Sequence, residues 1–295
     1  MGAMNDIART IAEAALGRDP GPLEAAKSLS HKVYVGADVV VKIIHADRHS
    51  RLNREIALAP MLPEGITAPL LASGRHEDLR YAVYARVPGT APGLHLPDTD
   101  ANTARKLAEQ AVERLELLHT WRPESTETLT EELDHGGFTG REAFRQEIER
   151  LEKADQDGVV PARVIKGLKE IADRAPEQAK ATVPVHADCH WANWLANGDT
   201  VTALLDFEWA RLAEPAEDWF FLIRFSGPHM ATVLDVVASH TAIPEDELRA
   251  ACEVRDANYV ASDVRLTLEG DPNAGVGSLA GLEEVIDHRY WWRSR

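Results

Sequence analysis

Two neighbouring stretches carry polar residues whose types and spacing suit phosphoryl transfer. His186, Asp188 and Asn193 follow one apolar, β-prone run in an H-x-D-x-x-x-x-N layout, and Asp206 follows a second such run. In this layout the first aspartate can accept the proton of an attacking hydroxyl, while the asparagine oxygen and the second aspartate can bind Mg²⁺. The pattern of strands and turns presents these groups where strands end, on a rigid frame that solvent can reach.

Glu208 extends this group of acids. It lies two residues beyond Asp206 on a stretch with the pattern of a strand, and residues two apart on a strand point to the same side. Mg²⁺ prefers a few hard oxygen ligands and keeps several of its waters. We therefore expect Asn193 and Asp206 to hold the metal, with Glu208 as an auxiliary ligand.

The loop carries a longer pattern as well. His186 to Asn193 reads His-Ala-Asp-Cys-His-Trp-Ala-Asn, and Leu-Asp-Phe-Glu follows at 205–208. Together these segments resemble the aminoglycoside phosphotransferase and choline-kinase-like family, whose usual loop is H-G-D-x-H-x-x-N. Ala187 replaces the glycine, and Trp191-Ala192 replaces a common Pro-Gly, while every polar position is kept. The resemblance implies an α+β, bilobal protein-kinase-like fold, with a small antiparallel-sheet N-lobe and a mainly helical C-lobe.

The resemblance also implies roles around the loop. Asp188 becomes the catalytic base, and His186 and His190 support the loop that carries it. The family has a P-x-x-D at the start of the next helix, and Pro215 with Asp218 matches it. Asp218 is therefore expected to organise the catalytic loop without touching the substrate.

The spacing separates this chain from protein kinases. Only eleven residues, 207–217, lie between Asp206 and Asp218, which is too few for an activation segment. His190 also occupies the position where protein kinases have a lysine. A small-molecule acceptor is therefore favoured over a protein.

The N-terminal part offers a cation for the nucleotide phosphates. Lys42 lies in an apolar run that forms a β-hairpin pattern with residues 32–35. A lone lysine on such a strand is often a solvent-facing edge residue, but the loop downstream favours a phosphate-binding lysine. A helix predicted over 49–62 supplies Glu55 as its anionic partner, with Glu64 as the weaker alternative.

The turn that would cover the phosphates has no G-x-G-x-x-G. The sequence there is Ser-Leu-Ser-His at 28–31. Members of the resembled family often use a short serine-bearing turn, so Ser28 and Ser30 are candidates for phosphate contact. An ordinary hairpin turn is the alternative.

Two further strands, over 68–74 and 79–87, precede Pro88-Gly89. In the resembled fold the purine lies against this connector, so Ala85 and Val87 are matched to backbone contacts with the purine. The same point divides the chain into a nucleotide-binding lobe, 1–88, and a catalytic and acceptor-binding lobe, 89–295. Residues 1–3 have the composition of a cloning remnant.

Apolar residues at helical spacing follow the connector. They predict helices over 99–120, 141–153, 161–175, 230–240, 245–269 and 279–292, with a loop over 124–140. The resembled family binds its acceptor with such C-terminal helices, often through carboxylates. The acids that become candidates for acceptor contact are Glu253, Asp256, Asp263 and Glu269.

Composition limits the partners. The chain has 295 residues, enough for two lobes, and a net charge of −16. This charge disfavours nucleic-acid and anionic-membrane binding and would attract a cationic small molecule. No apolar run approaches the roughly 20 residues of a membrane span. Two cysteines form no disulfide framework, which favours the cytoplasm, and nothing in the sequence fixes the oligomeric state.

Three other functions compete with this one. Cys189 and its neighbours His186, Asp188 and His190 could form a zinc site, but no second ligand pair follows at a defined spacing. A Cys189 nucleophile lacks an oxyanion signature, and the surrounding acids would raise the pKa of its thiol. A non-catalytic pseudokinase usually loses its base, metal asparagine or lysine, and all of these are present.

The sequence thus predicts a Mg²⁺-dependent small-molecule kinase that uses ATP or GTP. The expected acceptor is cationic, an antibiotic such as an aminoglycoside or a basic peptide. A choline-, homoserine- or sugar-type metabolite kinase is the alternative. A choline site would need an aromatic cage. Five tryptophans could supply the cage or belong to the core: Trp191, Trp194, Trp209, Trp291 and Trp292.

Overall fold

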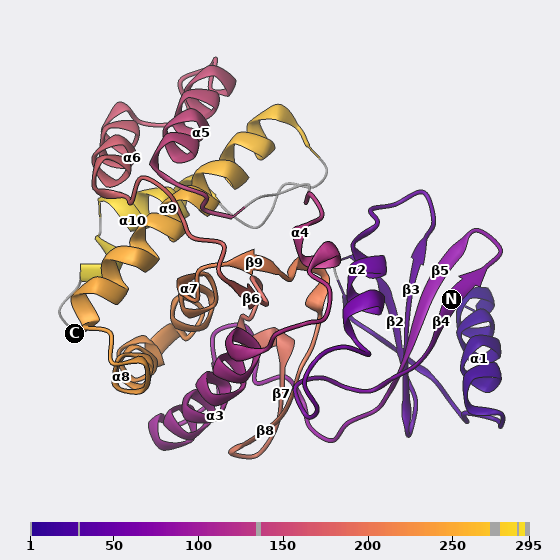
Figure 1. Ribbon diagram of the computed structural model, residues 1–295. Helices are drawn as coiled ribbons and strands as arrows, with labels where there is room; N and C mark the ends of the chain where they lie inside the picture. The colour runs from indigo at the N-terminus through magenta and orange to yellow at the C-terminus, as the bar shows by residue number, and fades with distance from the viewer. Residues whose placement is uncertain (1, 29, 134–136, 272–277, 288, 293–295) are drawn as a thin grey trace.

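The chain folds into two lobes, an antiparallel sheet with its helices at one end and a larger helical group at the other (Figure 1). The computed structural model describes residues 2–28, 30–133, 137–271, 278–287 and 289–292. Helix α1 begins at Gly2. Met1, the first of the three residues predicted to be a cloning remnant, lies outside the described residues.

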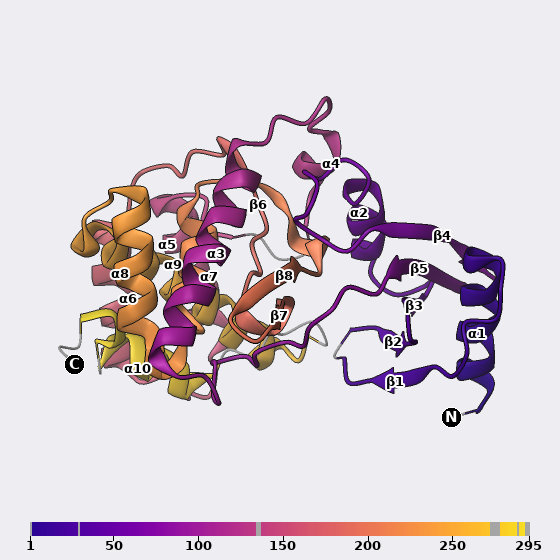
Figure 2. The ribbon, with the colours of Figure 1, turned by 90° about the horizontal axis from the view of Figure 1, so that it is seen from below.

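The N-terminal lobe is built on one five-stranded sheet in the order β1-β2-β3-β5-β4, with every neighbouring pair antiparallel. Its strands are β1 (Glu24–Ala26), β2 (Lys32–Val35), β3 (Val39–His45), β4 (Leu70–His76) and β5 (Leu79–Ala85). Helices α1 (Gly2–Leu16) and α2 (Arg51–Leu58) lie on opposite faces of this sheet, α2 on the side of the helical lobe (Figures 1 and 2).

The alternation of side chains along β3 distributes its residues between these two helices. Val39, Val41 and Ile43 pack in one apolar cluster with α1, whereas Ile44 packs in another with Leu52 of α2. Lys42 and Ile44 are two residues apart and therefore lie on the same face of the sheet, so Lys42 points toward α2 and the helical lobe.

The C-terminal lobe contains two apolar clusters, one around α3, α7 and α8 and one around α5, α6, α9 and α10. The helices are α3 (Ala101–Thr120), α4 (Glu127–Thr130), α5 (Arg141–Ala154), α6 (Ala162–Arg174), α7 (Ala216–Arg224), α8 (Met230–Thr241), α9 (Glu245–Glu269) and α10 (Leu279–Ile286). Among the described residues no single helix could cross a membrane, although the bent pair of Ala216–Arg224 and Gly227–Thr241 meets the length and composition criteria when taken together.

Two short antiparallel pairs lie between the lobes. β6 (Val183–Val185) pairs with β9 (Arg211–Ala213), and β7 (Trp194–Asn197) pairs with β8 (Thr200–Leu204). The 3₁₀ turns η1 (Trp191–Asn193) and η2 (Phe207–Trp209) adjoin them. These pairs place the polar segments after β6 and after β8 beside each other.

The predicted fold class, a small antiparallel sheet followed by a mainly helical lobe, is confirmed. The helix predicted over 49–62 is shorter and spans Arg51–Leu58, because Pro60 has no N–H group with which to continue the helical hydrogen bonds. The loop predicted over 124–140 contains the short helix α4, and residues 134–136 lie outside the described part. The last predicted helix ends at Ile286, and a 3₁₀ turn, η4 (Tyr290–Trp292), follows it.

The predicted lobe boundary at residue 88 stays a prediction. The chain beyond β5 is already tied to the C-terminal lobe, because the amide and carbonyl of Thr90 both bond to Ala196 of β7 over 2.9 Å.

Candidate active site

Lys42 is the cation at the centre of the site between the lobes. Its Nζ lies 2.6 Å from Oε2 of Glu55 on α2, 2.9 Å from Oδ1 of Asp206 and 3.1 Å from Oε1 of Glu208. The carboxylate oxygens of these three acids lie within 4.8 Å of one another. Lys42 therefore joins the sheet to the segment that follows β8.

The charged groups of this site shift the pKa values of one another. Burial by itself would lower the pKa of Lys42, but the carboxylates of Asp206, Glu55 and Glu208 hold this pKa well above its ordinary value. Burial would also raise the pKa of Asp206, and the Lys42 charge reverses that effect, so the pKa of Asp206 is lowered. At neutral pH the site holds a protonated lysine beside an ionised Asp206.

Glu55 is fixed from its other side by Tyr84. The hydroxyl of Tyr84 on β5 donates to Oε1 of Glu55 over 2.8 Å, which leaves Oε2 for Lys42. Glu64, the alternative partner, is exposed beyond the end of α2. The structure thus brings Lys42 to Glu55.

Asp218 holds the loop between β6 and η1. Its Oδ1 accepts from the amide of Ala187 over 2.7 Å, and its Oδ2 accepts from the amide of His186 over 3.0 Å and from Nε2 of His119 over 2.9 Å. The carboxylate is fully buried. Burial would raise the pKa of Asp218, but the bond from His119 and the neighbouring donors keep it below its ordinary value.

Ala187 explains why a glycine is usual at this position in the resembled loop. Its φ is +61°, in the left-handed region that glycine adopts without steric cost. The turn directs the ring of His186 inward, where Nε2 lies 2.9 Å from the carbonyl of Leu205 and Nδ1 accepts from the amide of Asp188 over 3.2 Å. The ring thereby links the catalytic loop to the end of the β8 segment.

Asp188 and Asn193 face each other across this loop. Nδ2 of Asn193 donates to the carbonyl of Asp188 over 2.8 Å and to its Oδ2 over 3.2 Å. The side chain of Asp188 is 24% exposed, so a substrate can reach it. Burial and the negative charge of Asp206 raise the pKa of Asp188 well above its ordinary value. Asp188 is consequently a stronger proton acceptor than an exposed aspartate.

His190 lies beside this carboxylate, with Nε2 3.6 Å from Oδ1 of Asp188. Burial lowers the pKa of His190 to about 4, so its ring is neutral at pH 7. Cys189 is fully buried and its Sγ donates to the carbonyl of Asp218 over 3.2 Å, while burial raises the pKa of its thiol. His186 and Cys189 thus bond to different partners, which disfavours both the zinc site and the thiolate nucleophile.

The segment after Asp206 differs from its prediction. Asp206 has a φ of +70°, and Phe207–Trp209 form a 3₁₀ turn, so the expectation of a strand that carries Asp206 and Glu208 on one side is wrong. Glu208 is buried with its Oε1 2.8 Å from Nε2 of His31. Its role as an auxiliary magnesium ligand stays a prediction.

The residues matched to phosphate and purine contacts lie around β2 and β5. Ser28 is exposed, Ser30 is half-buried with its Oγ 2.7 Å from Nδ1 of His31, and the intervening Leu29 lies outside the described residues. The amide of Ala85 donates to the carbonyl of Pro69 over 2.8 Å. A purine at this position would therefore have to bond to the carbonyl of Ala85. Val87 is half-buried on the connector.

The four acids proposed for acceptor contact lie along α9 in different environments. Glu253 is buried, pairs with an arginine of α6 over 3.1 Å and accepts from Nε1 of Trp292 over 2.9 Å. Asp256 is buried, pairs with an arginine of α7 over 2.9 Å and accepts from Nε1 of Trp291 over 3.0 Å. Both tie the C-terminal segment to α9. Asp263 is half-buried, and Glu269 is exposed in a pair with an arginine one turn before it.

The tryptophans considered for an aromatic cage are largely core residues. Trp191, Trp194 and Trp291 are fully buried. Trp209 stacks beneath the guanidinium of Arg51 at 4.5 Å from the ring centre, and Trp292 bonds to Glu253. At least three of the five therefore serve the hydrophobic core.

The sequence did not point to a second charge network beside the catalytic loop. Oε1 of Glu217 accepts from Arg211 and from Tyr259, each over 2.6 Å, and Oε2 accepts from Arg255 over 3.1 Å. Glu217 precedes Asp218 in the P-x-x-D pattern, but no sequence pattern links it to its partners on β9 and α9. Nor did any sequence pattern indicate that His31 and His49 lie close together.

Comparisons with known proteins agree with this geometry. Residues 24–250 match the phosphotransferase enzyme family (APH). No curated protein matches the chain. The ADP-bound aminoglycoside phosphotransferase APH(2'')-Ib is similar in structure, with 14% sequence identity, 97% of both chains covered and a TM-score of 0.64.

Two further solved structures show the same similarity. The GDP complex of an aminoglycoside 2'-phosphotransferase of type IIIa has 17% identity, 97% of both chains covered and a TM-score of 0.66. The streptomycin–ATP complex of APH(2'')-IIa has 14% identity, 92% of this chain and 94% of that chain covered, and a TM-score of 0.65. At such identities the similarity establishes a shared fold. Because the family match runs through both lobes and includes the catalytic loop, the chain belongs to the phosphotransferase enzyme family.

Proposed function

We propose that the protein transfers the γ-phosphoryl group of ATP or GTP to a hydroxyl group of a small, cationic acceptor. The observation that carries this proposal is the single site between the lobes. There Lys42, held by Glu55, contacts Asp206, and the partly exposed carboxylate of Asp188 lies bonded to Asn193. A non-catalytic pseudokinase usually lacks at least one of these groups, so their presence together favours a catalytic protein.

The donor atoms suit Mg²⁺. Both hydrogen bonds of the Asn193 amide use its nitrogen, which leaves the oxygen as the atom that a cation would bind. Asp206 supplies an ionised carboxylate, and amide and carboxylate oxygens are hard ligands. Asn193 and Asp206 would therefore hold the ion, which when bound neutralises charge on the nucleotide phosphates.

The residues of the chain would then position the reactants. The acceptor oxygen forms a bond to the γ-phosphorus while the bond from phosphorus to the bridging oxygen breaks, and the nucleoside diphosphate leaves with that oxygen. Asp188 orients the hydroxyl and takes its proton. Lys42 neutralises phosphate charge, and Asp218 keeps the loop in place through the amides of His186 and Ala187. Positioning and charge stabilisation supply most of such a rate enhancement.

The acceptor class follows from charge and from the relatives. A net charge of −16 attracts cations, and solved relatives of this fold include complexes with streptomycin, gentamicin and kanamycin. We therefore propose an antibiotic acceptor, an aminoglycoside or a basic peptide, in the cytoplasm. A choline-type acceptor is less supported, because Trp191, Trp194 and Trp291 are core residues. Homoserine- and sugar-type acceptors remain the metabolite alternatives.

A nucleotide-turnover assay tests the proposal. ATP or GTP with Mg²⁺ is supplied with a panel of aminoglycosides, basic peptide antibiotics, choline, homoserine and simple sugars. Asp188→Ala is the blank and Asp199→Ala is the matched control, since Asp199 is exposed on the turn between β7 and β8. We expect acceptor-dependent turnover that falls by about 10²–10⁴-fold or more in Asp188→Ala and is unchanged in Asp199→Ala.

Nucleotide binding and folding separate the possible failures. Asp188→Ala should bind nucleotide and unfold like the unchanged protein, because the carboxylate reaches toward the substrate. If this variant instead loses its folded structure, the assignment of Asp188 as the base is wrong. If the unchanged protein binds no nucleotide and turns over no acceptor, the protein is a non-catalytic binding module.

A further inference from the structure

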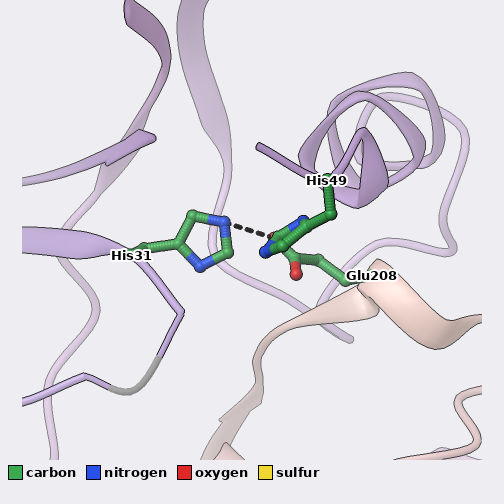
Figure 3. Close-up of side chains that lie close together, drawn as sticks. All are labelled: His31, His49 and Glu208. Atoms are coloured by element: carbon green, nitrogen blue, oxygen red, sulfur yellow. Dashed lines mark ion pairs between the residues drawn. The ribbon is translucent and has the colours of Figure 1, made fainter. Parts of the chain in front are cut away.

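Two histidines and one glutamate meet at the boundary between the lobes, outside the catalytic loop. His31 comes from the turn before β2, His49 from the segment before α2, and Glu208 from η2 in the C-terminal lobe (Figure 3). One ring nitrogen of each histidine and one carboxylate oxygen lie within 4.8 Å of one another. His31 is 5% and Glu208 is 2% exposed, so the group is largely shielded from water.

The polar atoms of this cluster are poorly satisfied by the protein. Among the described residues, neither ring nitrogen of His49 has a hydrogen-bond partner, although both are buried. Nε2 of His31 and Oε1 of Glu208 are 2.8 Å apart, yet their geometry is not that of a hydrogen bond. Buried polar atoms without partners are costly, so the convergence of these ring nitrogens on one carboxylate would suit a bound cation.

The arrangement around His31 has a further property of a metal ligand. Its Nδ1 lies 2.7 Å from Oγ of Ser30, a contact that fixes the orientation of the ring and leaves Nε2 directed at Glu208. Histidines that bind metals are commonly oriented in this way through their second nitrogen.

We propose that His31, His49 and Glu208 bind a divalent transition-metal ion of the zinc class, which links the two lobes. Imidazole nitrogens select zinc and its neighbours in the first transition row over Mg²⁺, which prefers oxygen. The site therefore differs in metal preference from the oxygen ligands Asn193 and Asp206. Three protein ligands leave one position of a tetrahedral ion for water.

The surrounding charges set the conditions for binding. Lys42 lies 3.1 Å from Oε1 of Glu208, and Arg51 lies 3.9 Å from Oε2, so the ion competes with two cations for this carboxylate. Binding then draws Glu208 away from Lys42 and joins segments of both lobes. The bound protein should therefore unfold at a higher temperature than the free protein, by mass action.

Equilibrium dialysis of the metal-free protein against Zn²⁺, in excess Mg²⁺, tests this proposal. We expect one bound Zn²⁺ per chain and an affinity that falls by about tenfold or more in His49→Ala and in Glu208→Gln. His45→Ala is the matched control. His45 lies four residues before His49 with a side chain that is 55% exposed, and its loss should leave the affinity unchanged.

A second measurement observes binding in the unchanged protein and uses variants only to assign its resonances. In the unchanged protein, titration with Zn²⁺ should shift the ring resonances of only two of the 12 histidines in an NMR spectrum. The assignments through His31→Asn and His49→Ala should identify them as these two. The proposal is overturned if Zn²⁺ does not bind, if other histidines respond in their place, or if His49→Ala binds as tightly as the unchanged protein, which would mark an adventitious ion only.

Discussion

Asp218→Asn should separate the support of the catalytic loop from its chemistry. The substitution keeps the size of the side chain but removes its charge and replaces one acceptor oxygen with an NH₂ donor. In the structure both oxygens are used. Oδ1 accepts from the amide of Ala187, and Oδ2 accepts from the amide of His186 and from His119.

The expected loss of stability follows from the backbone N–H groups for which an asparagine cannot supply an acceptor. If its oxygen takes the place of Oδ2, the NH₂ group faces the amide of Ala187. If the oxygen takes the place of Oδ1, the NH₂ group faces the amide of His186. In either orientation one buried backbone N–H loses its acceptor, which costs about 1–3 kcal/mol. With the loss of the charge-assisted bonds, we expect a destabilisation of about 2–5 kcal/mol.

The assay is urea unfolding followed by circular dichroism, at neutral pH and in acid. The folded-state pKa of Asp218 is lowered from an ordinary value of 3.8. Its contribution is thus fully present above that value and is lost as the pH falls through the lower folded-state pKa. The difference between the two proteins should therefore be constant near neutrality and shrink below about pH 4.

Asp199→Asn is the matched control. Asp199 also has a charged partner, Lys106 at 2.6 Å, but both side chains are 47% exposed. Water and salt screen an exposed pair, so this variant should be nearly as stable as the unchanged protein. If Asp218→Asn is no less stable than Asp199→Asn, or if its effect is the same at every pH, the carboxylate does not hold the loop as argued.

Two other substitutions probe the same loop and its partner segment. Asp206→Ala should weaken nucleotide binding by about tenfold or more in the presence of Mg²⁺ and much less in its absence, since the residue is proposed to act through the metal. Calorimetry measures both affinities, and equal affinities of the two proteins with Mg²⁺ would contradict that role. Ala187→Gly should keep activity and change the free energy of unfolding by no more than about 1 kcal/mol, because the relief of a left-handed alanine, about 1–2 kcal/mol, is offset by the greater chain entropy of glycine. A larger destabilisation in urea unfolding would show that the φ of +61° at Ala187 imposes no strain.

The parts of the site that lie close together in sequence were predictable. Asp188 and Asn193 are separated by four residues, and their hydrogen bonds are formed within one turn. The pairing of Lys42 with Glu55 was expected because the catalytic-loop pattern favours a phosphate-binding lysine and the helix predicted over 49–62 supplies a glutamate. For Asp188 and Asn193 the chain geometry over a few residues determines which side chains meet.

Contacts between distant segments were not predictable in this way. His31 and Glu208 are 177 positions apart, and neither lies in a pattern that refers to the other. The same holds for Glu217 with Arg255. Their meeting depends on how the two lobes, or α7 and α9, pack, which no local periodicity specifies. The acids of α9 show the converse, since a helix can be predicted while its partners, such as Trp291 for Asp256, remain unknown.

The backbone at Asp206 accounts for the failure of the prediction that one strand carries Asp206 and Glu208. A strand would carry Asp206 and Glu208 to one side, whereas the left-handed φ of +70° at Asp206 turns the chain into η2. Asp206 then contacts Lys42, and Oε1 of Glu208 contacts both Lys42 and His31. One left-handed residue thus turns the chain between two carboxylates that are two residues apart, so that both contact Lys42 and Glu208 also contacts His31. The segment thus supplies one carboxylate to the proposed oxygen-ligand site and one to the proposed histidine-containing site, and these two ligand sets favour different metals.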